Sequence, residues 1–169
     1  MASTRFTVEG LRELEKALED LRPATAKNVA RRALVKATQP VADHMSELAP
    51  PGKYNNLKRS IGISTRLSDR QKALHRKMFR SDRTSVELFL GPDYRRSGNH
   101  AHLVEFGTAE RRHKSGKSVG RMPPHPFARP AWDAGKQGIL TRLADLMWVE
   151  IEKAAARAAR KAARLAKKS

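Results

Sequence analysis

The chain has 169 residues, of which 35 are Lys or Arg and 17 are Asp or Glu, so its formal net charge is +18 at pH 7. This charge favours a polyanionic partner, such as nucleic acid, an acidic protein surface or an anionic membrane. The chain has no cysteine, which excludes a disulfide scaffold and a thiolate zinc site. It also has no apolar run long enough for a membrane span or a signal-peptide core.

The first third of the chain predicts two helices. Leucines at helical spacing predict a helix over 9–22, and Pro23 separates it from a second helix over 24–48. Pro40 lies within the apolar line of the second helix, where we expect a kink. The sequence Pro50-Pro51-Gly52 then ends that helix.

The middle of the chain predicts a small antiparallel sheet. Residues 53–60 indicate a short turn or helix, and a strand follows over 61–65. A second strand is predicted over 84–90, where apolar residues alternate with polar ones. The intervening residues 66–83 are basic with little apolar periodicity, so we expect a loop or an exposed hairpin. Such a connection allows the two strands to pair antiparallel.

The last third predicts a long C-terminal helix. A short helix over 100–106 should stop at Gly107, and a long basic loop should follow over 108–125. Pro130 suits the first turn of a helix that runs from about residue 131 towards 168. The predicted fold class is therefore α+β, with an N-terminal helix pair, a small antiparallel sheet and a long C-terminal helix. We expect one domain over 1–150 and a basic Ala/Arg/Lys helical extension over 151–169.

Two basic segments are candidates for contacting DNA or a protein partner. At 100° per residue, the cations of the extension fall on one helix face and its alanines on the other. The alternative is a solvated, helix-prone segment that keeps the protein soluble. The candidate contact residues are Arg111, Arg112, Lys114, Lys117 and Arg121 in the loop, and Arg157, Arg160, Lys161 and Arg164 in the extension.

The remaining reactive side chains do not form a catalytic constellation, and we expect no enzyme activity, cofactor or metal. His100, His102, His113 and His125 lack the spacing of a zinc site, and surface imidazoles are the simpler interpretation. The sequence Gly116-Lys117-Ser118 lacks the upstream glycine of a phosphate loop. Glu105 is either a catalytic acid or, as we favour, a carboxylate that pairs with an arginine or caps local backbone.

Four segments in a fixed order resemble a known family. They are Gly10-Leu11 with its leucine helix, Asn56-Leu57-Lys58-Arg59-Ser60-Ile61, His100-Ala101-His102-Leu103-Val104-Glu105-Phe106-Gly107-Thr108, and Pro124-His125-Pro126-Phe127-Ala128-Arg129-Pro130-Ala131. Together they cover roughly residues 8–150. This pattern resembles the tail-completion or neck proteins of long-tailed bacteriophages, the family labelled after the tenth gene product of a lambdoid coliphage.

The resemblance implies a structural subunit without catalysis. It implies a ring of six or twelve copies at the head–tail interface, which completes the tail and joins it to the head around the DNA channel. The implied partners are head-completion and tail-terminator subunits and genomic DNA, with no membrane. The implied location is the virion neck, after assembly in the host cytoplasm. The motif residues with a structural role are Glu105, Phe106, Gly107, Pro126, Phe127, Arg129 and Pro130.

Two other function classes remain open from the sequence. The basic extension and the net charge also suit a histone-like protein that binds DNA without sequence preference. That class predicts tight DNA binding that falls steeply with salt. A histidine–metal nuclease is a third class, and it predicts DNA cleavage that a chelator abolishes.

Overall fold

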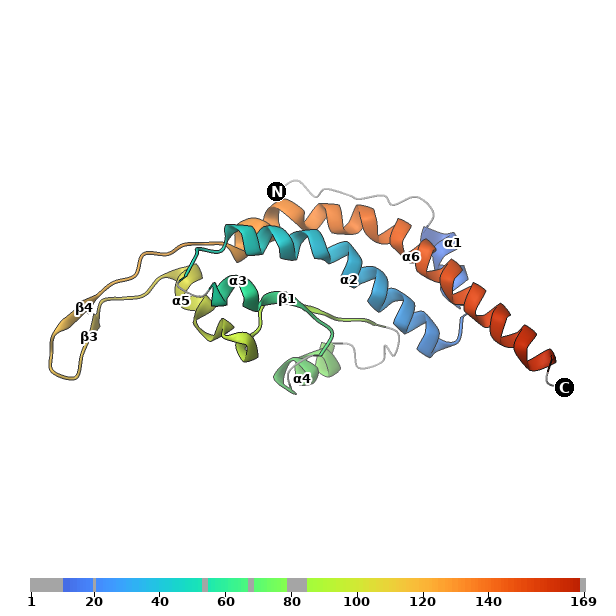
Figure 1. Cartoon of the computed structure of the whole chain (residues 1–169), viewed down its shortest axis with the longest axis horizontal. Helices are drawn as coiled ribbons and strands as arrows, with labels where there is room; N and C mark the ends of the chain where they lie inside the picture. The colour runs from blue at the N-terminus through green and yellow to red at the C-terminus, as the bar shows by residue number, and fades with distance from the viewer. Residues whose placement is uncertain (1–10, 20, 53–54, 67–68, 79–84, 168–169) are drawn as a thin grey trace. The chain divides into compact units, whose positions relative to one another are not determined.

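The structure is a computed structural model (Figure 1), and it describes residues 11–19, 21–52, 55–66, 69–78 and 85–167. The N-terminal helix pair, the small antiparallel sheet and the long C-terminal helix confirm the predicted α+β class. Two short 3₁₀ helices, η1 and η2, precede α5. The elements are α1 (Leu11–Glu19), α2 (Pro23–Leu48), α3 (Asn56–Ser60), β1 (Ile61–Ser64), α4 (Asp69–Met78), β2 (Phe89–Pro92), η1 (Tyr94–Arg96), η2 (Gly98–His100), α5 (Ala101–Phe106), β3 (Arg111–Arg112), β4 (Ser118–Gly120) and α6 (Ala128–Ala166).

The chain divides into two compact units. The first takes in Met1–Ala37, Leu67–Leu88 and Gln137–Ser169, and the second takes in Thr38–Arg66 and Phe89–Lys136. Because α2 and α6 each pass from one unit to the other, both helices contribute to both cores. None of the helices in the described ranges combines the length and apolar character that a bilayer crossing needs.

The core of the first unit joins α1, the N-terminal half of α2 and the C-terminal half of α6. Leu14, Val29, Ile151 and Ala154 are buried together there. Leu14 and Leu18 of α1 therefore pack against side chains of α2 and α6, as their helical spacing predicts.

A buried carboxylate sits beside this core. Glu150 is 3% exposed, and its oxygens accept hydrogen bonds of 2.6 Å from Arg32 Nε and from Lys36 Nζ. The Lys153 Nζ lies 3.8 Å from the same carboxylate. The hydrogen bond from Lys36 lowers the pKa of Glu150 most, and together with Arg32 it outweighs burial and brings the pKa to about 2. Glu150 is therefore charged in the folded protein at neutral pH.

The second unit contains the sheet and the second core. Strands β1 and β2 pair antiparallel, with Ile61 opposite Pro92 and Ser64 opposite Phe89. Around them, helices α2, α5 and α6 bury a cluster of mostly small side chains centred on Phe127, which is 1% exposed. The buried members are Met45, Ala49, Ala101, Phe127 and Ala131.

Helices α2 and α6 approach closely within this unit. A Cβ atom added at Gly135 would lie 2.4 Å from Val41 Cγ2, closer than side-chain carbons approach. Glycine is therefore what allows α6 to pack against Val41 at this point. The sequence analysis did not single out Gly135, because a glycine within a helical pattern looks only like a weak helix former.

Three segments between the helices differ from the prediction. Within 66–83 the structure has helix α4 rather than a loop or hairpin. The second strand is β2 over Phe89–Pro92 rather than 84–90, and residues 85–88 are not in a strand. The expected loop over 108–125 contains a hairpin of strands β3 and β4. The C-terminal helix also starts earlier than predicted, at Ala128, with Pro130 in its first turn.

Candidate functional site

Glu105 connects the two sequence motifs that the resemblance singled out. Its Oε2 accepts hydrogen bonds from the backbone N–H groups of Phe127 at 2.8 Å and Ala128 at 2.9 Å. Its Oε1 accepts one from the N–H of Arg129 at 3.0 Å. These N–H groups lie at the start of α6, where a helix lacks internal acceptors and its dipole favours negative charge. The carboxylate of α5 therefore caps α6 from 22 to 24 residues away in sequence.

The charge of Glu105 is held by this cap. Glu105 is 8% exposed, and burial alone would raise its pKa. The three backbone N–H groups and the nearby Arg129 charge outweigh burial, so the pKa of Glu105 lies below its usual value. The structure thus places Glu105 in a backbone cap, but the capped backbone is 22 to 24 residues away rather than local as the sequence analysis expected.

The segment after Glu105 is fixed to the segment before α6. Gly107 has a φ of 73°, and a Cβ there would lie 2.8 Å from Met122 O and from Pro124 N. The Thr108 N–H donates to Met122 O at 2.9 Å, and the Met122 N–H donates back to Thr108 Oγ1 at 3.0 Å. Only glycine suits both the positive φ and this close approach. These bonds hold together the two ends of the basic segment 109–121.

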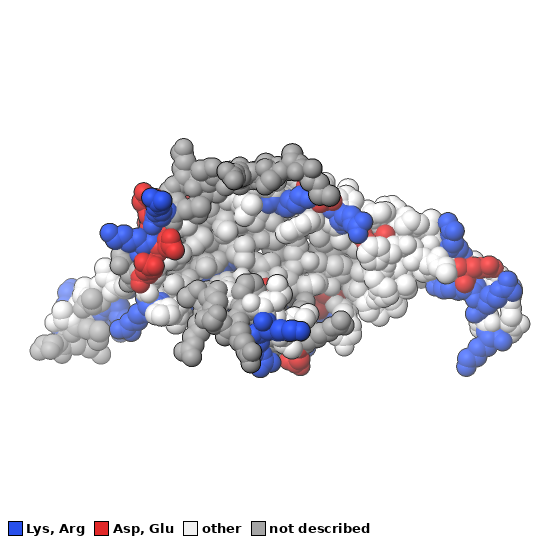
Figure 2. All heavy atoms as spheres, turned by 180° about the vertical axis from the view of Figure 1, so that it is seen from behind, with Lys and Arg blue, Asp and Glu red and all other residues white. Residues whose placement is uncertain are grey.

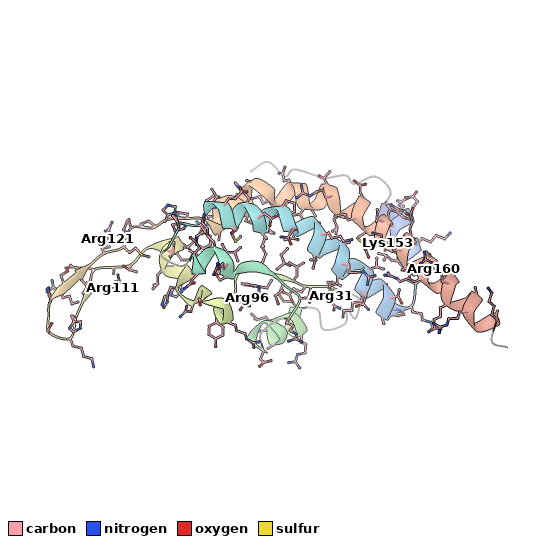
Figure 3. The ribbon with its side chains drawn as sticks, in the orientation of Figure 1. Arg31, Arg96, Arg111, Arg121, Lys153 and Arg160 are labelled. Carbon is pink, nitrogen blue, oxygen red and sulfur yellow. The ribbon has the colours of Figure 1, made fainter. Side chains whose placement is uncertain are left out.

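We call residues 109–121 the arm. Strand β3 pairs antiparallel with β4, with Arg111 opposite Gly120 and an irregularity in register after it. At the turn, the His113 N–H donates to Lys117 O at 2.8 Å, and Gly116 adopts a φ of 82°. Every residue of the arm is exposed. Figure 2 shows Lys and Arg atoms gathered over this hairpin. Figure 3 places Arg111 on its outgoing segment and Arg121 on its returning segment.

A single ion pair occurs among the cations of the arm. Glu110 Oε1 lies 3.8 Å from an Arg112 guanidinium nitrogen and accepts a hydrogen bond from Ser118 Oγ at 2.8 Å. Within the described part of the chain, the other arm cations form no ion pair, and these are Arg111, Lys114, Lys117 and Arg121. The arm therefore presents charge that its own unit does not neutralise.

The C-terminal part of α6 carries the second group of candidate residues. We call Arg157, Arg160, Lys161 and Arg164 the terminal stripe, and all four are exposed. Lys153 and Arg160 lie along this helix in Figure 3. From residue 155 to 167, every side chain whose burial is described is exposed. Ile151 and Ala154 at the start of the extension are buried against the first core, whereas from residue 155 on neither the alanine face nor the basic face has a covering element in the described residues.

The other residues of interest are mostly at the surface. Phe106 is 69% exposed, and Pro126, Arg129 and Pro130 are at least partly exposed as well, whereas Phe127 belongs to the core. The four histidines considered for a metal site are all exposed. Within the described ranges, no three His, Cys, Asp or Glu side chains lie close enough together to hold a metal ion.

The family model described as "Bacteriophage HK97-gp10, putative tail-component" matches residues 12–107. The chain belongs to this family. As a member of the HK97 gp10 family it is a structural component of a bacteriophage tail and thus of the virion. No curated protein and no solved structure gives a match to the chain.

The matched range ends at Gly107, within the motif that contains Glu105. The family match therefore includes the capping carboxylate but not the start of α6 that it caps, which the resemblance had assigned to the same pattern. The hydrogen bonds of Glu105 connect the motif at 100–108, which the match reaches, with the motif that begins α6, which lies outside the match. The arm and the terminal stripe also lie outside the matched residues.

Sequence reasoning missed Glu150, the buried carboxylate of the first unit. Its signal was present in the pattern, since Glu150 falls on the apolar face of α6, three residues after Met147 and next to Ile151. An acid on such a face needs buried counter-charges. Arg32 and Lys36, one turn apart on α2, supply them.

Proposed function

We propose that this HK97 gp10 family member forms a ring at the head–tail interface, where it completes the tail and joins it to the head around the DNA channel. The observation that carries the proposal is the anchored basic arm. The Glu105 cap fixes the start of α6, the bonds between Thr108 and Met122 join the two ends of the arm, and every residue of the arm is exposed. A lone two-stranded hairpin is marginal in water. An arm held in this way is suited to reach a neighbouring molecule in an assembly.

The charge supports the same proposal. A closed ring of six or twelve copies multiplies the +18 of one chain and needs counter-charge to form. Acidic surfaces on head-completion and tail-terminator subunits and the genomic DNA in the channel would supply it. In this proposal residues 1–150 form the neck domain, and residues 151–169 form a basic extension that reaches one of these neighbours.

The test is deletion of the gene from the phage that encodes it, followed by electron microscopy of the lysate. We expect DNA-filled heads and separate tails that do not join, and we expect supply of the full chain from a plasmid to restore joined particles. Antibody labelling of the restored particles should place the chain at the junction. Joined, infectious particles without the gene, or a label along the tail shaft, would contradict the proposal.

A further inference from the structure

The arm is the most strongly charged part of the second unit that nothing in its own unit covers. Its thirteen residues include five Lys or Arg and a single acid. Val119, which is 56% exposed, is its only large apolar side chain. The arm therefore offers charge and hydrogen-bond donors to a partner but almost no apolar surface.

This composition points away from a protein partner. The centres of protein–protein interfaces are anchored by aromatic or aliphatic side chains and are depleted in lysine. The arm has no aromatic residue other than His113, and two of its five cations are lysines at the turn. A phosphate backbone, by contrast, is contacted by Arg, Lys and Ser side chains and by backbone N–H groups, with no apolar anchor.

We infer that the arm binds the phosphate backbone of double-stranded DNA without sequence preference. The four unpaired cations, Arg111, Lys114, Lys117 and Arg121, are the contact residues, and Ser115 and Ser118 lie among them. Glu110 keeps Arg112 partly neutralised, so Arg112 contributes less. This inference rests on the proposed function, because the DNA channel of the neck is where the arm would meet a duplex.

The anchored root of the arm favours this assignment over the terminal stripe. The bonds between Thr108 and Met122 join the two chain segments at the root of the arm. Less conformational freedom is then lost when the arm binds. The terminal stripe carries a similar number of cations but lies on a helix whose opposite face is alanine, which suits packing against a protein helix.

The experiment compares two variants of the full chain that lose equal charge. The arm variant is R111Q/K114Q/K117Q/R121Q, and the stripe variant is R157Q/R160Q/K161Q/R164Q. Each has a net charge of +14, four below the wild type. The probe is a fluorescent 30-base-pair duplex, and its affinity is measured by anisotropy over a series of salt concentrations. Thermal melting checks that both variants fold, which we expect because all eight side chains are exposed.

The inference predicts that the slope of log affinity against log salt becomes shallower by about 3 to 4 in the arm variant, near 0.9 for each phosphate that the variant no longer neutralises. The stripe variant should change the slope by less than about 1. A second duplex of unrelated sequence should give the same affinities. Equal slope changes in the two variants would overturn the inference, because net charge rather than the arm would then bind DNA. An unchanged slope in the arm variant would also overturn it.

The outcomes of the test separate this inference from the proposed function. An arm variant that binds DNA like the wild type but fails to restore joined particles would assign the arm to an acidic protein surface and overturn the DNA inference alone. Weaker DNA binding by the arm variant, with the shallower slope, supports the inference. Whether the wild-type chain lies at the head–tail junction is decided separately by the deletion and labelling experiment.

Discussion

Glu105 and Glu150 are both buried carboxylates, but different groups compensate their charges. Backbone N–H groups at a helix start hold Glu105, whereas the side chains of Arg32 and Lys36 hold Glu150. The Glu105 cap fixes the position of α5 against the start of α6, and the Glu150 ion pairs fix the alignment of α2 with α6 in the first unit. Each carboxylate thus has a role that a substitution can isolate.

Removing the Glu105 carboxylate should destabilise the protein. In E105A the N–H groups of Phe127, Ala128 and Arg129 lose their acceptor, at a cost of about 1 to 3 kcal/mol. E105Q retains a single acceptor oxygen and should lose less. Urea unfolding monitored by circular dichroism measures the loss. The control is E110A, which removes an exposed carboxylate and should change stability by less than about 1 kcal/mol. Equal losses in E105A and E110A would show that the cap is unimportant.

The Glu150 cluster should give a pH-dependent contribution to stability. The folded pKa of about 2 lies below the ordinary value of 4.5, so the contribution is full above about pH 4.5 and is lost as the pH falls towards 2. E150Q should therefore be less stable than the wild type by about 2 kcal/mol at pH 7, since Arg32 and Lys36 are half exposed and solvent relieves part of the penalty.

The measurement for Glu150 is the difference in unfolding free energy between wild type and E150Q from pH 2 to 7. The difference should shrink as the pH falls. E152Q, at an exposed site two residues away, is the matched control and should stay close to the wild type. A difference that stays constant across this range would mean that the ion pairs do not stabilise the fold.

At the scale of secondary-structure elements, the sequence predicts the helices that bury a face of regularly spaced apolar residues. Helices α1, α2 and α6 have buried apolar faces, and their periodicity revealed them. Helix α4 was missed because it has no such face: Leu74 and Met78 are 52% and 73% exposed. Strand β2 was misplaced because its extent depends on its partner. The four residues of β1 pair with Phe89–Pro92, whereas the alternating pattern begins before this range.

The same distinction holds for the candidate site. Gly107 and Glu105 were identifiable as a helix stop and an unusual acid in a basic region. The partners of Glu105 were not, because its hydrogen bonds span more than twenty residues and go to backbone atoms that leave no mark in the sequence. The hairpin of the arm was also invisible, since Arg111, Arg112 and Lys114 show no alternation of apolar and polar residues.

The packing of α2 against α6 gives a prediction at the same scale. In G135A the added methyl group would overlap Val41, which should cost more than the helix propensity gained and lower stability by about 1 to 2 kcal/mol. G138A is the matched control in the same helix, because the nearest group there is the end of the long Arg142 side chain at 3.1 Å, which can shift more readily than the branched side chain of Val41. We expect G138A to be neutral or slightly stabilising in chemical denaturation. A G135A protein as stable as G138A would refute the close packing.

At the scale of the whole molecule, charge is the dominant property. A net charge of +18 makes copies of the chain repel one another, and salt screens this repulsion over about 10 Å at 0.1 M and about 3 Å at 1 M. The proposed ring must form against this repulsion. The extent of self-association in solution should therefore depend on ionic strength, and the sign of that dependence tells whether repulsion between like charges opposes assembly.

We expect self-association of the purified chain to increase with salt. Light scattering at 0.1 M and 1 M salt should show a larger mass at the higher concentration, because screening removes the repulsion between copies. The +14 variants should reach that mass at lower salt than the wild type does. A mass that falls as salt rises would instead show that attraction between opposite charges holds the copies together.

The exposed turn of the arm has a consequence for following assembly in time. Lys114 and Lys117 flank Gly116 at the tip of a hairpin, and exposed tips with small residues are preferred sites of proteolytic nicking. Trypsin should therefore cut the free chain first at this tip and in the exposed end of α6. In the proposed assembly, DNA bound to the arm would shield the tip, so the fraction of chain that trypsin leaves uncut would measure how far the arm has become bound at each time point.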